Sequence, residues 1–77
     1  MEGLTIGRMV HFVLSPDVHR AAIITNVLDP KKGVCDLLVF LAPKDERGDF
    51  LTYPGAWYAP GKHASTWHWI ESTNEIT

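Results

Sequence analysis

The sequence predicts an all-β protein that folds as one small five-stranded barrel. Segments rich in Val, Ile, Phe, Tyr and Trp recur along the chain at intervals of roughly 8–14 residues, separated by stretches with Pro, Gly or Asp. No stretch has the apolar periodicity of a long helix. The 77 residues suffice for one domain. We expect its core within residues 8–71 and a polar tail at 72–77.

Residues 8–14 predict the first strand because their side chains alternate in character. Val10 and Phe12 fall on one face, and His11 falls on the other. The Ser-Pro-Asp sequence at 15–17 is typical of a turn, since Pro presets the backbone angle and Asp can bond its own main chain.

The next two predicted strands are joined by a hairpin turn. Residues 20–28 are rich in Ile, Thr and Val, and residues 29–33 end in Gly33, which can adopt a positive φ. Residues 34–41 are almost continuously apolar except for Asp36. We therefore expect a central strand that is covered on both faces.

A charged loop at 42–49 separates these strands from the last third of the chain. Residues 50–59 contain Pro54 and Gly55, which do not suit a regular central strand. We expect two short strands or one bent strand at an edge, followed by a last strand at 66–71. Five strands with short connections favour a Src-homology-3-like barrel over an oligonucleotide-binding barrel, which usually needs more residues and a helix.

Charge narrows the possible partners. Seven basic residues stand against nine acidic ones, for a net charge of −2. Proteins that bind an extended nucleic acid are usually basic, because released counterions supply much of the affinity. Extended nucleic acid is therefore not an expected partner, whereas a small anionic ligand needs only two or three local cations.

The compartment follows from what the sequence does not contain. A single cysteine cannot form an intramolecular disulfide, which suits a reducing cytoplasm. No leader-like segment and no stretch of about 20 apolar residues is present. We expect a cytoplasmic protein without a membrane partner. A short core without disulfides also favours a homo-oligomer.

Metal binding and catalysis find little support in the sequence. His11, His19, His63, His68 and Cys35 are candidate ligands, but none forms a pair with the short spacing typical of a zinc site. Cys35 lies in an apolar run and is expected in the core rather than as a nucleophile. We therefore expect no metal, no cofactor and no enzymatic activity.

The sequence supports a ligand-binding surface better than it supports a metal site or a catalytic site. Aromatic residues gather in the last third of the chain, and cationic residues lie in the first two strands, which can neighbour the last strand in a barrel. Aromatic faces stack on bases, and Arg or His can hold phosphates. The candidate ligand-binding residues are Arg8, His11, His19, Arg20, Trp57, Tyr58, Trp67, His68 and Trp69.

The two tryptophans of the last strand have an alternative interpretation. Trp67 and Trp69 point to the same face, and small barrels use such residues to fill their cores. We expect at least one of them in the core. His68 points to the opposite face, where we expect it to meet solvent or a partner.

Four stretches together resemble a group of small phage and prophage proteins with a Src-homology-3-like barrel. These stretches are RMVHF (8–12), HRAAII (19–24), LVF (38–40) and TWHWIE (66–71). The group has an Arg-x-Val-His-[Phe/Tyr] first strand and a Trp-His-Trp last strand, and it tends to have Pro where Ile70 stands here. The resemblance implies a phage origin and the host cytoplasm as location. It supplies no catalytic residues.

Small phage proteins of this kind often counter host defences. The expected function is a non-enzymatic module that sequesters a small nucleotide-type ligand. The alternative is a protein-interaction module that inhibits or scaffolds a host or phage protein through the aromatic edge and the Pro54-Gly55 bend. Nucleic-acid binding is a weaker alternative.

Overall fold

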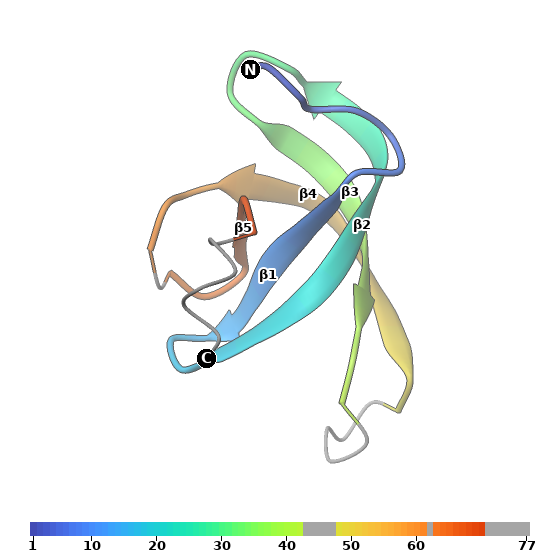
Figure 1. Ribbon diagram of the computed structural model, residues 1–77, viewed down its shortest axis with the longest axis vertical. Coiled ribbons are helices and arrows are strands. Elements are labelled where there is room, and N and C mark those ends of the chain that lie inside the picture. Colours follow the sequence, from blue (N-terminus) through green and yellow to red (C-terminus); the bar gives the residue numbers. More distant parts are fainter. Residues whose placement is uncertain (43–47, 62, 71–77) are drawn as a thin grey trace.

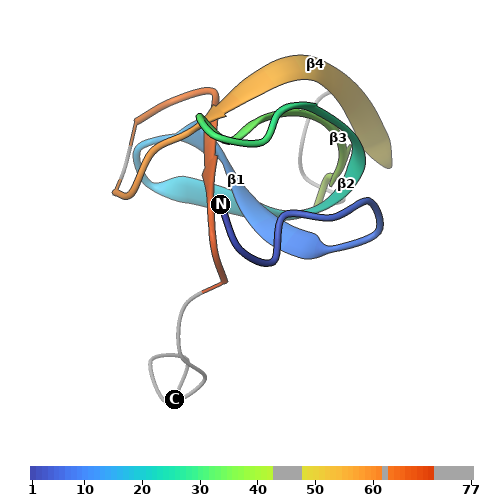
Figure 2. The ribbon, with the colours of Figure 1, turned by 90° about the horizontal axis from the view of Figure 1, so that it is seen from above.

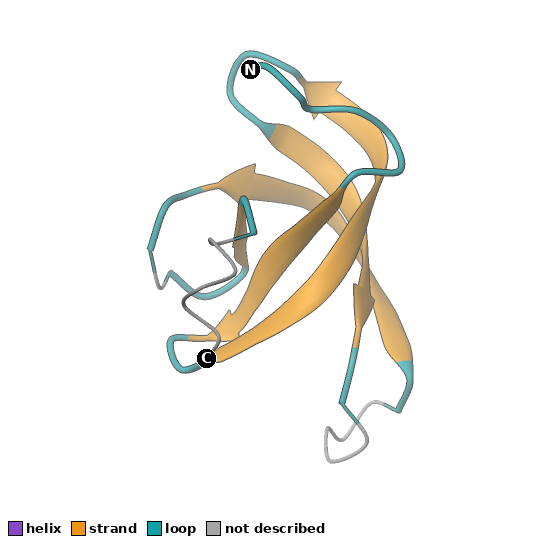
Figure 3. Ribbon diagram, in the orientation of Figure 1, coloured by secondary structure: helices purple, strands orange, loops and turns teal. Residues whose placement is uncertain are grey.

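The computed structural model describes residues 1–42, 48–61 and 63–70, and these residues form a closed all-β barrel (Figures 1 and 3). Its strand order is the sequence order, with the last strand closing against the first. The predicted all-β fold class is confirmed, and the arrangement is consistent with a Src-homology-3-like barrel. The strands are β1 (Met9–Ser15), β2 (Val18–Asp29), β3 (Val34–Phe40), β4 (Phe50–Tyr58) and β5 (Thr66–His68).

The shortest strand closes the barrel. β5 pairs antiparallel with β1 and parallel with β4, so it joins the two ends of the four-stranded antiparallel sheet. Figure 2, seen from above, shows the strands encircling a common centre. The described residues contain no helix of the length and apolar character that a bilayer crossing requires.

Alternating side chains fill the interior. Val10 and Phe12 of β1 share one face, as their alternation predicts, and that face is buried, with Phe12 opposite Trp67 of β5. Trp67 is fully buried, and its indole Nε1 donates a 2.7 Å hydrogen bond to the carbonyl of Gly33. The contiguous core consists of Leu4, Val10, Phe12, Ala22, Ile24, Cys35, Leu37, Val39, Ala56 and Trp67.

β3 is central, but the prediction that it is covered on both faces is wrong. It pairs with β2 on one side and with β4 on the other. Its residues alternate between buried and more exposed positions, and Phe40 is 39% exposed. The apolar run therefore includes outward-facing residues, Leu38 and Phe40, that are only partly covered or exposed.

β4 is one bent strand, as one of the two predicted alternatives states, but it is not an edge strand because β5 pairs with its end. Gly55 adopts a φ of 67°, and the register with β3 shifts at this point. The Gly55 amide donates a 2.8 Å hydrogen bond to Oδ1 of Asp36. A side-chain carboxylate thus replaces the ladder partner where the strand bends.

The β2–β3 turn forms as predicted. Gly33 has a φ of 75°, and Oδ1 of Asp29 accepts hydrogen bonds from the amides of Lys31 and Lys32, both at 3.1 Å. The last strand is shorter than predicted and ends at His68. Most of the predicted charged loop and the polar tail lie outside the described residues.

Candidate functional site

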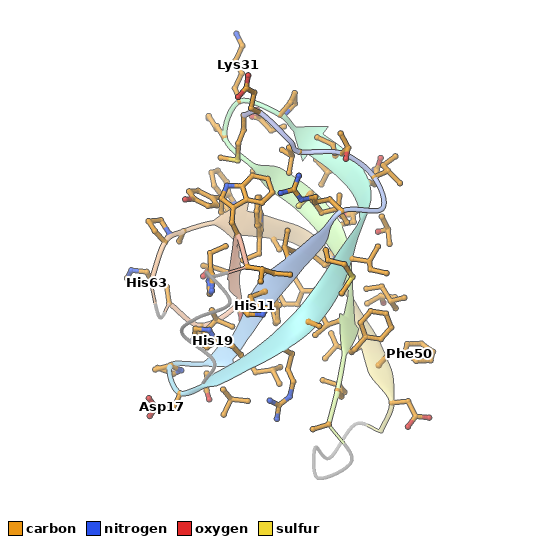
Figure 4. The ribbon with its side chains drawn as sticks, in the orientation of Figure 1. His11, Asp17, His19, Lys31, Phe50 and His63 are labelled. Atoms are coloured by element: carbon orange, nitrogen blue, oxygen red, sulfur yellow. The ribbon has the colours of Figure 1, made fainter. Side chains whose placement is uncertain are left out.

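Strand pairing brings three histidines together on the outer face of the barrel. His11 of β1 lies directly opposite His68 of β5. His19 of β2 lies opposite Val13, which is two residues beyond His11, so His19 is a diagonal neighbour of His11 on the same face. Figure 4 shows His11 and His19 close together beside β1. We call His11, His19 and His68 the histidine cluster.

The rings of the histidine cluster meet edge to face. Their centroids are 5.0 Å apart for His19 and His68, 5.6 Å for His11 and His68, and 6.4 Å for His11 and His19. One ring nitrogen from each residue can be chosen so that all three lie within 4.8 Å of one another. Three potential donor nitrogens therefore converge from three different strands.

The histidine cluster is half enclosed. His68 is only 6% exposed, whereas His11 and His19 are partly exposed. Nδ1 of His68 is an enclosed atom with no hydrogen bond to the described residues, although the ring has other contacts. The prediction that His68 faces away from the core tryptophan is confirmed, but the prediction that it meets solvent is wrong.

One neighbour of the histidine cluster, Val13, is apolar and lies opposite His19. Val13 is fully buried, yet it does not belong to the contiguous core. Its carbonyl accepts a 2.7 Å hydrogen bond from the Ser65 amide, which anchors the segment that leads into β5. His63 of that segment is exposed and stands apart from the cluster (Figure 4).

A second group of predicted residues gathers at the end of the barrel where the β2–β3 turn lies. The guanidinium carbon of Arg8 lies 4.9 Å from the ring centroid of Trp69. Trp69 packs edge to face on Trp67, and Trp67 packs in the same way on Tyr58, both with centroids 5.0 Å apart. The aromatic rings thus form a row from the core to the surface.

The first residues of the chain connect this aromatic row to the β2–β3 turn. They run from beside that turn to the start of β1 (Figure 1), and the Met1 side chain approaches Gly33. Lys31 projects from the turn at the same end of the molecule (Figure 4), and Lys32 is also exposed. We call Arg8, Lys31, Lys32, Tyr58 and Trp69 the cationic-aromatic end.

The predicted ligand-binding residues therefore do not form one site. Trp67 is fully buried, so its ring cannot stack on a ligand. Trp57 is 54% exposed and belongs to neither group. Arg20 lies opposite Phe12 in the register, on the face that His19 does not share, and its Nη1 donates to the carbonyl of His19.

Two shallow hollows lie elsewhere on the described surface, and neither is lined by a basic side chain. One is lined by Thr25, Asp36, Leu37, Thr52, Tyr53 and Pro54, and the other by Phe12, Leu14, Leu51, Thr52, Tyr53 and Ser65. An anionic ligand would find no counter-charge in either. The cationic-aromatic end is thus the better candidate for an anion.

Cys35 is a core residue, as the sequence predicts. It is fully buried, and burial raises the pKa of its thiol to about 11, with a smaller contribution from the Asp36 carboxylate. A thiol with so high a pKa forms little of the reactive thiolate near neutral pH.

Spacing along the chain does not reveal the histidine cluster. His11, His19 and His68 are far apart in sequence, and the strand pairing alone brings them together. The available signal was their common outward position on strands expected to be neighbours, although the register was not known.

Comparison with known proteins adds no relative. No family model, no curated protein and no solved structure matches the chain. The function must therefore be argued from the geometry of the two groups.

Proposed function

We propose that the protein is a non-enzymatic binding module that takes up a small anionic ligand of the nucleotide type at the cationic-aromatic end. The observation that carries the proposal is the Arg8 guanidinium stacked 4.9 Å from the centre of the Trp69 ring. Stacking fixes one face of the guanidinium and leaves its N–H edge available for two parallel hydrogen bonds to a phosphate.

Further charge lies on a fixed turn at the same end. The carboxylate of Asp29 holds the amides of Lys31 and Lys32, so the backbone that carries both side chains is ordered. Together with Arg8, this end supplies three basic side chains in a chain whose net charge is −2. A small phosphate ligand needs only two or three local cations, far fewer than a long nucleic acid requires.

Aromatic surface for a base comes from the same end. Tyr58 and Trp69 are both partly exposed, and each packs against the buried Trp67. Rings that are already fixed lose little entropy when a base stacks on them, and such stacking contributes about 1–3 kcal/mol per base.

A binding role without catalysis is supported by the state of the one cysteine. Cys35 is enclosed in the core and its pKa is raised to about 11, which disfavours a nucleophilic role. The resemblance to small phage proteins extends the proposal to a biological role, in which the module counteracts host defence in the host cytoplasm by sequestering a nucleotide signal.

Calorimetric titration with a panel of linear and cyclic nucleotides tests the proposal. Arg8→Gln removes the stacked cation, and Arg20→Gln is the matched control because it removes a distant arginine of the same charge. We expect Arg8→Gln to weaken binding at least roughly tenfold, since a hydrogen bond to a charged group contributes about 1.5–3 kcal/mol. Binding no tighter than about millimolar, or equal losses in both variants, would contradict the proposal.

A second candidate function is favoured by the apolar outer face. Phe40 and Phe50 are directly paired and are 39% and 59% exposed. Such a surface suits a protein-interaction module that inhibits or scaffolds a host or phage protein. This function predicts a stable complex with one identified protein that Phe50→Ser abolishes, without any retained small molecule.

A further inference from the structure

We propose that the histidine cluster binds one divalent transition-metal ion of the zinc type. This site is separate from the cationic-aromatic end, and it does not depend on the function proposed for that end. His11, His19 and His68 place one nitrogen each within a mutual distance of 4.8 Å. Three imidazoles are a common donor set for zinc in sites that keep a fourth position open.

The distances are close to those of an occupied site. Zinc–nitrogen bonds of 2.0–2.1 Å in a tetrahedral arrangement place the ligand nitrogens about 3.3 Å apart. Rotating imidazole rings about their side-chain bonds moves the nitrogens by the remaining ångström or so, because the ring torsion is soft. The backbone does not have to move, since the paired strands already bring the three residues together.

The strand pairing makes the site rigid and still reachable. His11 and His68 are fixed by direct pairing, and His68 is almost fully buried. His11 and His19 are partly exposed, so an ion can enter from solvent on their side. Val13, which pairs with His19, is a fully buried apolar neighbour of the cluster.

The donor set also selects the ion. Imidazole nitrogens suit zinc, copper, nickel and iron, whereas magnesium and calcium require oxygen ligands. Because an imidazole binds a metal as a neutral ligand, three of them leave the ion with its full positive charge. The open fourth position would then take water or an external anion.

The competing interpretation is that the three rings only pack against one another. The edge-to-face contacts at 5.0–6.4 Å between ring centroids are compatible with packing alone. Packing alone predicts no stoichiometric metal uptake. Metal binding predicts an affinity that falls when any one of the three imidazoles is replaced.

Zinc titration of the metal-stripped chain at about pH 7.5, where a free imidazole is mostly neutral, tests the proposal. Calorimetry measures stoichiometry and affinity, and Co²⁺ absorption reports nitrogen coordination. His11→Gln and His19→Gln are the test variants, because both positions are partly exposed and tolerate a polar side chain. His63→Gln is the matched control, since His63 is exposed and outside the cluster.

We expect one ion per chain at micromolar affinity or tighter. His11→Gln and His19→Gln should each weaken binding by at least roughly tenfold, while His63→Gln leaves it unchanged and circular dichroism shows all variants folded. The proposal is overturned if the wild-type chain shows no saturable binding, if both test variants bind like the wild type, or if His63→Gln weakens binding as much as they do. Failure of nucleotide binding would not affect this outcome.

Discussion

Replacing Gly33 by alanine tests how closely the β2–β3 turn packs on β4. A Cβ at Gly33 would lie 2.7 Å from the Cβ of Tyr58, and Gly33 also has a φ of 75°. Gly55 is the matched control, because its φ is 67° and a Cβ there would meet nothing within 4 Å. Both substitutions place alanine at a positive φ. Only Gly33→Ala also brings the new Cβ into collision with Tyr58.

The magnitude follows from these two contributions. Alanine at a positive φ is strained, whereas it also lowers the conformational entropy of the unfolded chain. The net effect is a decrease of about 1 kcal/mol in the free energy of unfolding. The collision at Gly33 involves an atom attached directly to the β4 backbone, so the strand must shift, and overpacking of this kind costs about 2 kcal/mol more. We therefore expect Gly33→Ala to destabilise the fold by about 3 kcal/mol and Gly55→Ala by about 1 kcal/mol.

Thermal unfolding followed by circular dichroism measures the difference. For a domain of this size, a gap of about 2 kcal/mol corresponds to roughly 8–16 °C between the melting temperatures of the two variants. Gly33→Ala should also weaken nucleotide binding, because Gly33 borders the cationic-aromatic end. Equal melting temperatures for the two variants would refute the close packing of the turn on Tyr58.

Further outcomes are expected for three residues. Trp67→Phe removes the hydrogen bond to Gly33 and leaves a partly filled space in the core. The free energy of unfolding measured by urea denaturation should therefore fall by about 2 kcal/mol. Asp36→Ala removes the acceptor of the Gly55 amide and should cost about 1–2 kcal/mol, with Asp36→Asn costing less because its amide oxygen can still accept. The pKa of about 11 predicts that iodoacetamide alkylates Cys35 far more slowly in the folded than in the urea-unfolded chain at about pH 8. Because an unfolded thiol has a pKa of 9.0 and the folded pKa is higher, the contribution of this group to stability is fully present below pH 9 and is lost as the pH rises through about 11.

Alternation and turn chemistry were sufficient to predict most of the barrel. Val10 and Phe12 share one face of β1 and His11 lies on the other, as predicted, and Gly33 adopts the positive φ that its turn requires. Side-chain alternation and turn conformation depend on residues that are close together in the sequence. They can therefore be predicted from short stretches of the chain.

The errors arise where pairing between distant strands decides the outcome. A continuous apolar run does not reveal that the outer face around Phe40 is exposed rather than covered. Nor does Pro54 prevent β4 from having a neighbour on both sides, because the pairing with β5 lies beyond the bend. The register of His11 with His68 likewise sets the geometry of the histidine cluster, and no spacing along the chain encodes it.

The outer apolar face and the cationic-aromatic end differ in whether they require a second copy of the chain. A ligand site that lies on one chain works in a monomer, whereas an exposed Phe40–Phe50 pair can be covered by a second copy. The homo-oligomer expected from the short chain remains a proposal. Light scattering of the wild type and Phe50→Ser tests it, since a dimer that uses this face should dissociate in the variant.

Native mass spectrometry of the wild type and Arg8→Gln, each mixed with the nucleotide panel, tests the binding function most directly because it reports ligand occupancy and assembly together. The proposal predicts one nucleotide per chain on the wild type and a clearly lower occupancy on Arg8→Gln at the same concentrations. A bare wild-type chain across the whole panel, or the same occupancy on both proteins, would contradict binding at the cationic-aromatic end.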